Sequence, residues 1–260
     1  MGDDADNIKA IVQGSTQGAV EGAMQPFSDL LQALLGPSAE EAGLLLRDYV
    51  TAFRVEKRIQ LLDRLRKVLG RAGIKPSRVP MNLLGPIFEA ATLEENSELQ
   101  QIWANMLANA ANPESLDAVA PSFPGILKEM RPADVKFLEA LYEEFIAKYL
   151  ETNQTPRSSQ LISYKSLRYA MKKAGLLQAE KLYERRQTEK DAYLAAVTTD
   201  NRELAFILNT LQRQRIIEEE YDVTHGDSEG SVELGSALRV SELGIQFVEA
   251  CRPPKETKLS

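Results

Sequence analysis

Residues 80–141 read PMNLLGPIFEAATLEENSELQQIWANMLANAANPESLDAVAPSFPGILKEMRPADVKFLEAL. Apolar residues recur in this stretch at the three- and four-residue steps of a helix with one buried face: Leu99, Ile102, Trp103, Met106, Leu107 and Ala110. Several prolines and glycines interrupt the stretch, and such residues end or kink helices. We therefore expect short helices packed around this stripe, in a mostly α fold built as a multi-helix bundle.

Capping signals place the helix ends inside this stretch. Thr92-Leu93-Glu94-Glu95 matches a capping box, in which a threonine caps the helix start and the glutamate three positions later reaches back. The helix that follows should stop at Asn112, because the residue before a proline resists helical geometry. Pro132 suits the first position of a helix that runs to about Leu150.

A long helix should precede the stretch. Ser38-Ala39-Glu40-Glu41 is another capping box after the Gly36-Pro37 break, and it predicts a helix that continues to about Arg71. The core-facing positions of this helix share a helical step of three or four residues: Val55, Ile59, Leu62, Leu65 and Leu69.

The C-terminal part has a different outline. It predicts a helix over Asn201–Gln214, strands over Ile216–Val223 and Val232–Val240, and a last helix from Ser241 to Cys251. Helix, strand, strand and helix in this order indicate a small winged-helix-like α+β unit. The expected organisation has four parts: an N-terminal helix (1–36), a helical core (37–151), a helical and winged-helix-like region (152–252) with its linker at 152–160, and a disordered tail (253–260).

Bulk composition excludes several classes of protein. The chain has 260 residues and a net charge of −7, so general affinity for nucleic acid is not the default expectation. The longest uncharged run, residues 99–113, is shorter than the roughly 20 apolar residues that span a bilayer. The first residues, MGDDADNIK, do not have the pattern of a secretory signal, and the single cysteine fits a reducing compartment. We therefore expect a cytoplasmic protein, with peripheral contact at the inner membrane as an open alternative.

No combination of residues predicts catalysis. A phosphate-binding loop, a zinc-protease helix motif and a nucleophile elbow are all missing from the sequence. Cys251 ends an apolar stripe, so it is more simply a core residue than the partner of His225 in a dyad. Carboxylates surround that histidine in a cluster whose spacing matches no EF-hand loop: Glu218, Glu219, Glu220, Asp222, Asp227 and Glu229. We expect no enzyme activity, no metal and no cofactor.

The chain resembles the abortive infection alpha (Abi-alpha) family of bacterial proteins. The resemblance rests on SAEEAGLLLRDYV after Gly36-Pro37, on Gly85-Pro86-Ile87 and above all on ELQQIWANMLANA (Glu98–Ala110). It continues through ILKEMRPADVKFLEAL to NTLQRQRII and LRVSELGIQFVEAC near the end of the chain. Relatives are linked to bacteriophage exclusion, so the resemblance implies an anti-phage role. It implies no catalytic residue.

A stripe of three glycines marks the N-terminal segment. Gly14, Gly18 and Gly22 recur every fourth residue, so on a helix they form one bare stripe about 12 Å long. Small residues at this spacing let helices approach closely, as membrane-associated helices do. We favour the simpler alternatives, which are tight packing against the protein's own helices or a loosely held segment.

A second candidate surface is the basic helix that precedes residue 80. Residues 54–78 hold nine lysines and arginines against two acidic residues, a net of +7. The candidate contacts on its outer face are Arg54, Lys57, Arg58, Arg64, Lys67 and Arg71. This face suits anionic lipid headgroups or nucleic-acid phosphates. A solvated face, or one paired with acidic residues of the same chain, is the simpler alternative.

The winged-helix outline offers a nucleic-acid alternative. Arg202, Arg213 and Arg215 would be the contacts on its recognition helix, supported by the basic stretch 157–190. Charge opposes this reading, because residues 200–260 hold seven basic and twelve acidic residues, a net of −5. We therefore expect a non-enzymatic anti-phage protein that acts through a protein partner, self-association or the membrane surface. A nucleic-acid-binding regulator is the alternative.

Overall fold

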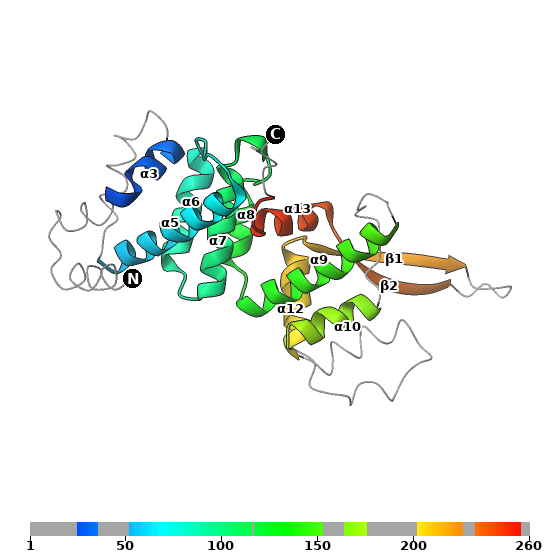
Figure 1. Cartoon of the computed structure of the whole chain (residues 1–260). Helices are drawn as coiled ribbons and strands as arrows, with labels where there is room; N and C mark the ends of the chain where they lie inside the picture. Colours follow the sequence, from blue (N-terminus) through cyan, green and yellow to red (C-terminus); the bar gives the residue numbers. More distant parts are fainter. Residues whose placement is uncertain are drawn as a thin grey trace. The chain divides into compact units, whose positions relative to one another are not determined.

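The computed structural model describes residues 25–35, 52–115, 117–152, 164–175, 202–225 and 232–255. This part of the chain is mostly helical and contains one two-stranded antiparallel sheet near the C-terminus (Figure 1). The mostly helical prediction is therefore confirmed. The chain divides into two compact units, one formed by Met1–Lys128 with Glu249–Ser260 and the other by Glu129–Val248.

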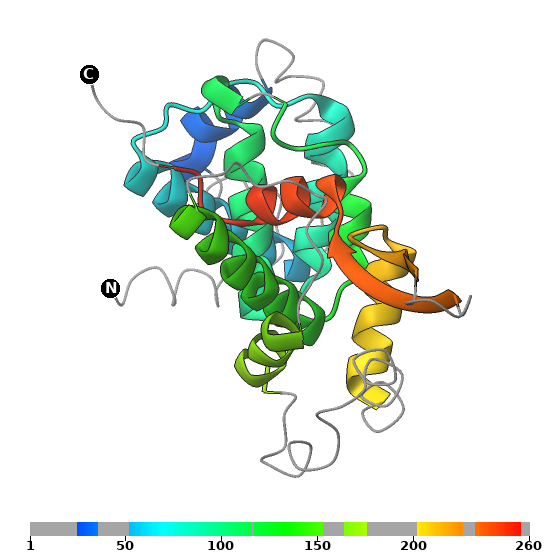
Figure 2. The same ribbon diagram turned by 90° about the vertical axis from the view of Figure 1, so that its right-hand side faces the viewer.

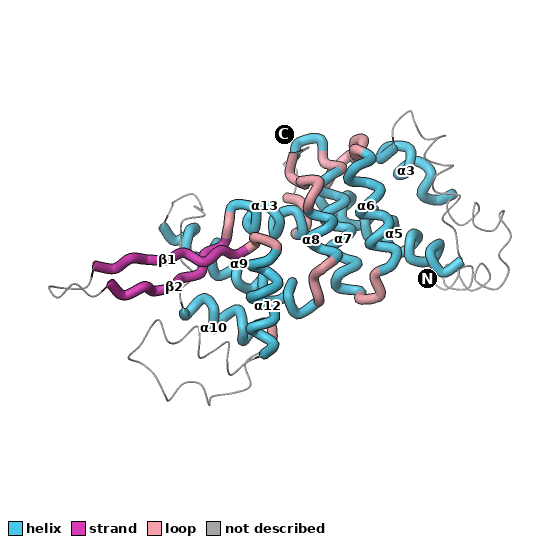
Figure 3. Tube along the Cα trace, turned by 180° about the vertical axis from the view of Figure 1, so that it is seen from behind, coloured by secondary structure: helices cyan, strands magenta, loops and turns pink. Residues whose placement is uncertain are grey.

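The first unit is a helical bundle. Its elements are η1 (Gln25–Phe27), α3 (Ser28–Leu35), α5 (Ala52–Ala72), α6 (Met81–Leu93), α7 (Ser97–Ala110), η3 (Pro113–Ser115) and α8 (Phe123–Lys128). Helices α5, α6 and α7 pack against one another, and α8 packs on α6 (Figures 1 and 3). The predicted end of the basic helix near Arg71 is confirmed by the end of α5.

Helix α7 is the central helix of this unit. The predicted apolar stripe is buried, and the Trp103 side chain is only 1% exposed. The opposite side of α7 is buried too, including Ala104, Asn105 and Asn109. Burial on all sides explains why the run from residue 99 to 113 carries no charge, since an unpaired charge there would be costly.

The capping signal predicted at Thr92 is wrong. Helix α6 continues through Thr92 to Leu93, and the Thr92 hydroxyl donates to the Glu89 carbonyl at 2.9 Å. Asn96 caps α7 instead, because its side chain accepts hydrogen bonds from the Glu98 and Leu99 amides at 2.9 and 3.1 Å. Asparagine is among the strongest N-cap residues, so the next strong capping residue along the chain takes the role.

The second unit combines helices with the sheet. Its elements are α9 (Pro132–Thr152), α10 (Tyr164–Lys173), α12 (Arg202–Arg213), β1 (Ile217–His225), β2 (Val232–Val240) and most of α13 (Glu242–Cys251). Helix α10 packs along α9, and α12 contacts both α9 and β1 (Figure 2). Pro132 begins α9 as predicted.

Strands β1 and β2 form a hairpin. Ile217 pairs with Val240 at its base and His225 with Val232 at its far end. The predicted β2 bounds are confirmed, and β1 runs two residues further than expected. The order helix, strand, strand, helix is therefore present.

The hairpin leads into α13 through a tight junction. The Ser241 hydroxyl accepts a hydrogen bond from the Gly244 amide at 2.9 Å and donates to the Arg215 carbonyl at 2.5 Å, so Ser241 opens the helix as expected. Gly244 lies against the backbone of Ile216, and a Cβ at this position would overlap the Ile216 carbonyl oxygen. Only glycine fits there without a shift of the backbone.

Several expectations fall on segments outside the described residues. These are the glycine stripe at 14–22, the capping box at 38–41, the linker beyond Thr152 and most of the basic stretch 157–190. The tail expected from residue 253 is described only as far as Lys255, and Pro254 within it is buried.

Candidate interaction surfaces

Helix α5 does not present its cations on one face. Lys67 and Arg71 are exposed, Lys57 and Arg64 are half-buried, and Arg58 is 8% exposed. The side chain of Arg54 is outside the described set. The expected outer face therefore keeps Lys67 and Arg71 as its accessible members and loses Arg58 to the interior.

The burial of Arg58 follows from its helical position. Arg58 lies four, seven and eleven residues before Leu62, Leu65 and Leu69, so it shares their face. The same spacing that identified the apolar stripe also identifies Arg58 as an inward-facing residue. Its charge, and not its position, led to its assignment to the outer face.

Two cations of the candidate face have partners on neighbouring side chains. Lys67 pairs with Asp63 one turn earlier at 2.6 Å, with both side chains largely exposed. Arg64 lies 3.5 Å from the Gln101 side-chain oxygen of α7. An exposed pair within one helix contributes only about 0.3–0.5 kcal/mol, so Lys67 can exchange Asp63 for another anion at little cost.

The exposed cations continue beyond α5 into the following loop. Lys75 and Arg78 are exposed there, and with Lys67 and Arg71 they define what we call the α5 basic edge. Within the described part of the chain, Arg71, Lys75 and Arg78 form no ion pair. Pairing with described acidic residues of the same chain therefore does not explain these three charges.

Sequence reasoning missed Arg66. Its guanidinium lies over the Phe27 ring, 4.3 Å from the centroid, and it donates a hydrogen bond to the Pro26 carbonyl. Arg66 therefore binds the short η1 segment, forty residues earlier in the chain. A single arginine among nine basic residues carries no sequence signal for such a contact, which depends on the tertiary fold.

Sequence reasoning also missed the structural role of two buried asparagines of α7. Asn105 donates to the Cys251 carbonyl at 3.0 Å, and Asn109 lies 3.0 and 2.8 Å from the Ala250 and Arg252 carbonyls. The last carbonyls of a helix lack partners within the helix. The two asparagines supply those partners and fix the C-terminus of α13.

The three arginines of the nucleic-acid alternative lie in different settings. Arg202 is exposed at the start of α12, whereas Arg213 pairs with Glu129 at 2.9 Å. Gln214 donates to the same Glu129 carboxylate. Arg215 is exposed and has a φ of 57°, in the left-handed region that glycine normally occupies at a helix end.

Arg131 covers part of the outer surface of α12. Its guanidinium lies 4.1 Å from the centroid of the Phe206 ring and pairs with Glu203 at 2.9 Å. It also pairs with the fully buried Asp134 at 2.9 Å. The hydrogen bond with Asp134, followed by the charges of Asp134 and Glu203, raises the pKa of Arg131, so its positive charge is held firmly.

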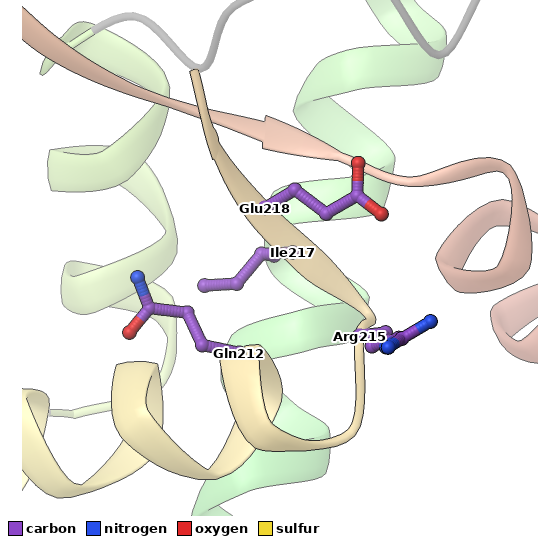
Figure 4. A pocket seen from close by; sticks show the side chains of 4 residues that line it. All are labelled: Gln212, Arg215, Ile217 and Glu218. Atoms are coloured by element: carbon purple, nitrogen blue, oxygen red, sulfur yellow. The ribbon is translucent and has the colours of Figure 1, made fainter. Parts of the chain in front are cut away.

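A surface depression lies where α12 meets β1. It has a volume of 440 Å³ and is lined by Gln212, Arg215, Ile217 and Glu218 (Figure 4). Gln212 and Arg215 point to opposite sides of the turn in Figure 4, so their polar atoms do not converge on one point. The depression therefore lacks the convergent polar groups that define a ligand site.

The acidic cluster around His225 separates along the hairpin. Glu218 faces Arg239 across the register and pairs with it at 2.8 Å. The side chains of Glu219, Glu220, Asp222 and His225, and the whole of Asp227 and Glu229, lie outside what the structure describes. Among the described side chains, no three acidic, histidine or cysteine residues gather as metal ligands. Cys251 is buried at the end of α13.

A search of the described helices for membrane spans gives a negative result. None of them combines the length and the apolar character needed to cross a bilayer.

Comparison with known proteins identifies one family. A family model described as abortive infection alpha matches residues 54–251. The match extends from α5 to the last residue of α13, and so includes both asparagines of α7. No curated protein and no solved structure matches the chain.

Proposed function

The chain belongs to the abortive infection alpha family, which implies a role in phage defence, and from this premise we propose that it acts through surface contacts and not through catalysis. Its working surfaces would be the α5 basic edge and the N-terminal segment that carries Gly14, Gly18 and Gly22. The contact would take place in the cytoplasm, with an anionic partner at or near the inner membrane.

The observation that carries this proposal is that several buried polar side chains form hydrogen bonds with backbone groups. Asn105 and Asn109 hold the end of α13, Gln100 donates to the Glu94 carbonyl at 2.7 Å, and Asp134 accepts from the Arg131 amide at 2.7 Å. Each of these groups satisfies backbone at a helix end or junction. Polar groups of the core thus serve the architecture, which supports a scaffold whose activity lies on its surface.

The α5 basic edge supports an anionic partner. Its four cations are exposed, and three of them form no ion pair within the described residues. Each lysine or arginine close to an anionic lipid surface contributes about 1 kcal/mol, and the attraction weakens with salt. An acidic protein surface would be recognised by the same charges.

Two measurements test the proposal together. A phage-challenge plating assay should show fewer plaques for cells that carry the intact chain than for cells without it. Removing residues 1–24, which keeps the buried Phe27 and Leu34 in place, should reduce that protection. Sedimentation with phosphatidylglycerol vesicles distinguishes a lipid partner from a protein partner. If the chain stays in the supernatant both with and without residues 1–24, the membrane form of the proposal is wrong.

A second candidate function is nucleic-acid binding by a winged helix. The element order α12, β1, β2, α13 favours it, as do the exposed Arg202 and Arg215. Two features weigh against it: Arg213 is paired with Glu129, and Arg131 lies over Phe206 on the outer surface of α12. Salt-dependent binding to a short DNA duplex or an RNA hairpin, lost in Arg202→Glu, would support it; no binding near physiological salt would remove it.

A further inference from the structure

The segment of η1 and α3 is too short to be stable without support. Helix α3 has eight residues, and isolated helices shorter than about 12–15 residues are marginal in water. Its docking on the first unit must therefore come from a small number of contacts. Such elements belong to the least stable parts of a protein and open first.

Two apolar side chains anchor this segment at its ends. Phe27 is 6% exposed and Leu34 is fully buried, whereas Leu30 and Leu31 between them are only half-buried. The Val79 amide donates a hydrogen bond to the Leu34 carbonyl at 2.9 Å. That bond satisfies one of the last carbonyls of α3, which lack partners within the helix.

Arg66 supplies the polar part of the attachment. One guanidinium lies over the Phe27 ring at 4.3 Å and donates to the Pro26 carbonyl. A cation over an aromatic face and a charge-assisted hydrogen bond reinforce each other when a single planar group makes both. Lysine lacks this planar fork, so it cannot replace arginine fully.

We propose that Arg66 is a latch that holds residues 25–35 on the bundle and keeps their apolar side chains from a membrane surface until the latch is released. The inference rests on the proposed function, in which that segment takes part in defence. Release would expose Phe27, Leu34 and the half-buried Leu30 and Leu31 together. These residues form one apolar surface on an amphipathic element, suited to a membrane surface next to the cations of α5.

The chain offers a matched control next to the latch. Lys67 is adjacent, exposed and on the same helix, but among the described residues its ion pair is with Asp63, one turn away in α5. Arg66→Ala and Lys67→Ala therefore remove the same charge from the same helix. Only the first variant removes a contact with residues 25–35.

Amide hydrogen exchange in the full chain tests the latch. Arg66→Ala should speed exchange of the α3 amides and of the Val79 amide by roughly tenfold to a hundredfold. Lys67→Ala should leave both unchanged, and Arg66→Lys should lie between them. Trp103 fluorescence, which reports the buried core of the same unit, should be unchanged in all three variants.

The outcomes separate the latch from the proposed function. Equal exchange in Arg66→Ala and the intact chain, or equal acceleration in Arg66→Ala and Lys67→Ala, overturns the latch. Arg66→Ala should also bind phosphatidylglycerol vesicles more tightly than the intact chain, although it has one cation fewer, and equal or weaker binding overturns the inference as well. Arg66-dependent exchange in a chain that gives no phage protection would overturn the proposed function and leave the latch in place.

Discussion

Gly244 shows how one missing methyl group permits the junction between the hairpin and α13. A Cβ there would overlap the Ile216 carbonyl oxygen, and a backbone atom cannot move aside as a flexible side chain can. Gly70 of α5 is a useful contrast, because a Cβ there meets no atom within 4 Å. Two glycines of one chain should therefore respond in opposite directions to the same substitution.

We expect Gly244→Ala to destabilise the second unit by at least about 1–3 kcal/mol, the range for forced overpacking. Gly70→Ala should stabilise the first unit by roughly 0.5–1 kcal/mol, because alanine favours a helix more than glycine does. Far-ultraviolet circular dichroism in urea measures both units, whereas Trp103 fluorescence follows the first unit. A neutral Gly244→Ala would contradict the close approach.

Asn109 illustrates a residue whose importance depends on a partner far along the chain. Its amide lies within hydrogen-bonding distance of the Ala250 and Arg252 carbonyls, which are 141 and 143 residues later. Asn105 holds the neighbouring Cys251 carbonyl. Removing such a donor leaves buried acceptors without a partner, which is the costly case for hydrogen bonds.

Asn109→Ala should therefore lower the free energy of unfolding of the first unit by about 1–3 kcal/mol. Asn109→Asp should cost more, because it adds a buried charge that faces carbonyl oxygens. The urea midpoint read by Trp103 fluorescence measures both changes. An Asn109→Ala variant as stable as Asn82→Ala, an exposed asparagine of α6, would refute the role of Asn109.

At the scale of elements, the start of α7 shows that a local capping motif does not by itself decide which residue caps a helix. Thr92-Leu93-Glu94-Glu95 has the form of a capping box, but Ala90, Ala91 and Thr92 are buried within α6. Burial of this face extends α6 past the motif, and Asn96 is left to cap α7. Local signals located the break between the helices to within a turn, and tertiary packing decided which residue caps.

Substitutions of Asn96 and Thr92 should differ in their effect on the free energy of unfolding. Asn96→Ala removes the cap of α7 and should cost about 1 kcal/mol of stability. Thr92→Val keeps the buried volume and removes a hydroxyl whose hydrogen bond, within the described part of the chain, goes to the Glu89 carbonyl of its own helix, so it should be nearly neutral. Urea unfolding of the two variants measures the difference, and a larger loss in Thr92→Val would restore the motif's assignment.

Helix α5 shows that charge alone does not predict which of its basic residues lie on an accessible surface. Periodicity predicted its buried leucines and its end, and the same spacing places Arg58 among them. A count of cations could not separate Arg58, which is buried, from Arg66, which binds Phe27, or from Arg71, which is exposed. A helical wheel identifies Arg58 as an inward-facing residue. The environments of Arg66 and Arg71 depend instead on neighbours from distant parts of the sequence.

At the scale of the whole molecule, the elements were more predictable than the contacts between them. Apolar periodicity and turn residues predicted α7, α9 and the hairpin, because these signals are local. The docking of residues 25–35 by Arg66 and the support of α13 by Asn105 join segments about 40 and 146 residues apart. Pairings at such distances leave no periodic pattern in one sequence.

Charge is distributed unevenly over the molecule. The whole chain carries −7, yet residues 54–78 carry +7 and residues 200–260 carry −5. A net negative protein can therefore present a local cationic surface, and salt screens its attraction for an anionic partner with a Debye length of about 8 Å at physiological ionic strength.

The most direct test of the account is phage plating on cells that carry a charge-reversed basic edge, with Lys67, Arg71, Lys75 and Arg78 changed to glutamate. Removing four cations should weaken contact with an anionic surface by roughly three orders of magnitude, and the four added carboxylates should weaken it further, so protection should be lost. Arg202→Glu with Arg215→Glu reverses two exposed cations outside the basic edge and is the control, which should protect as the intact chain does. Full protection by the basic-edge variant would contradict the role of the basic edge, whatever the control shows.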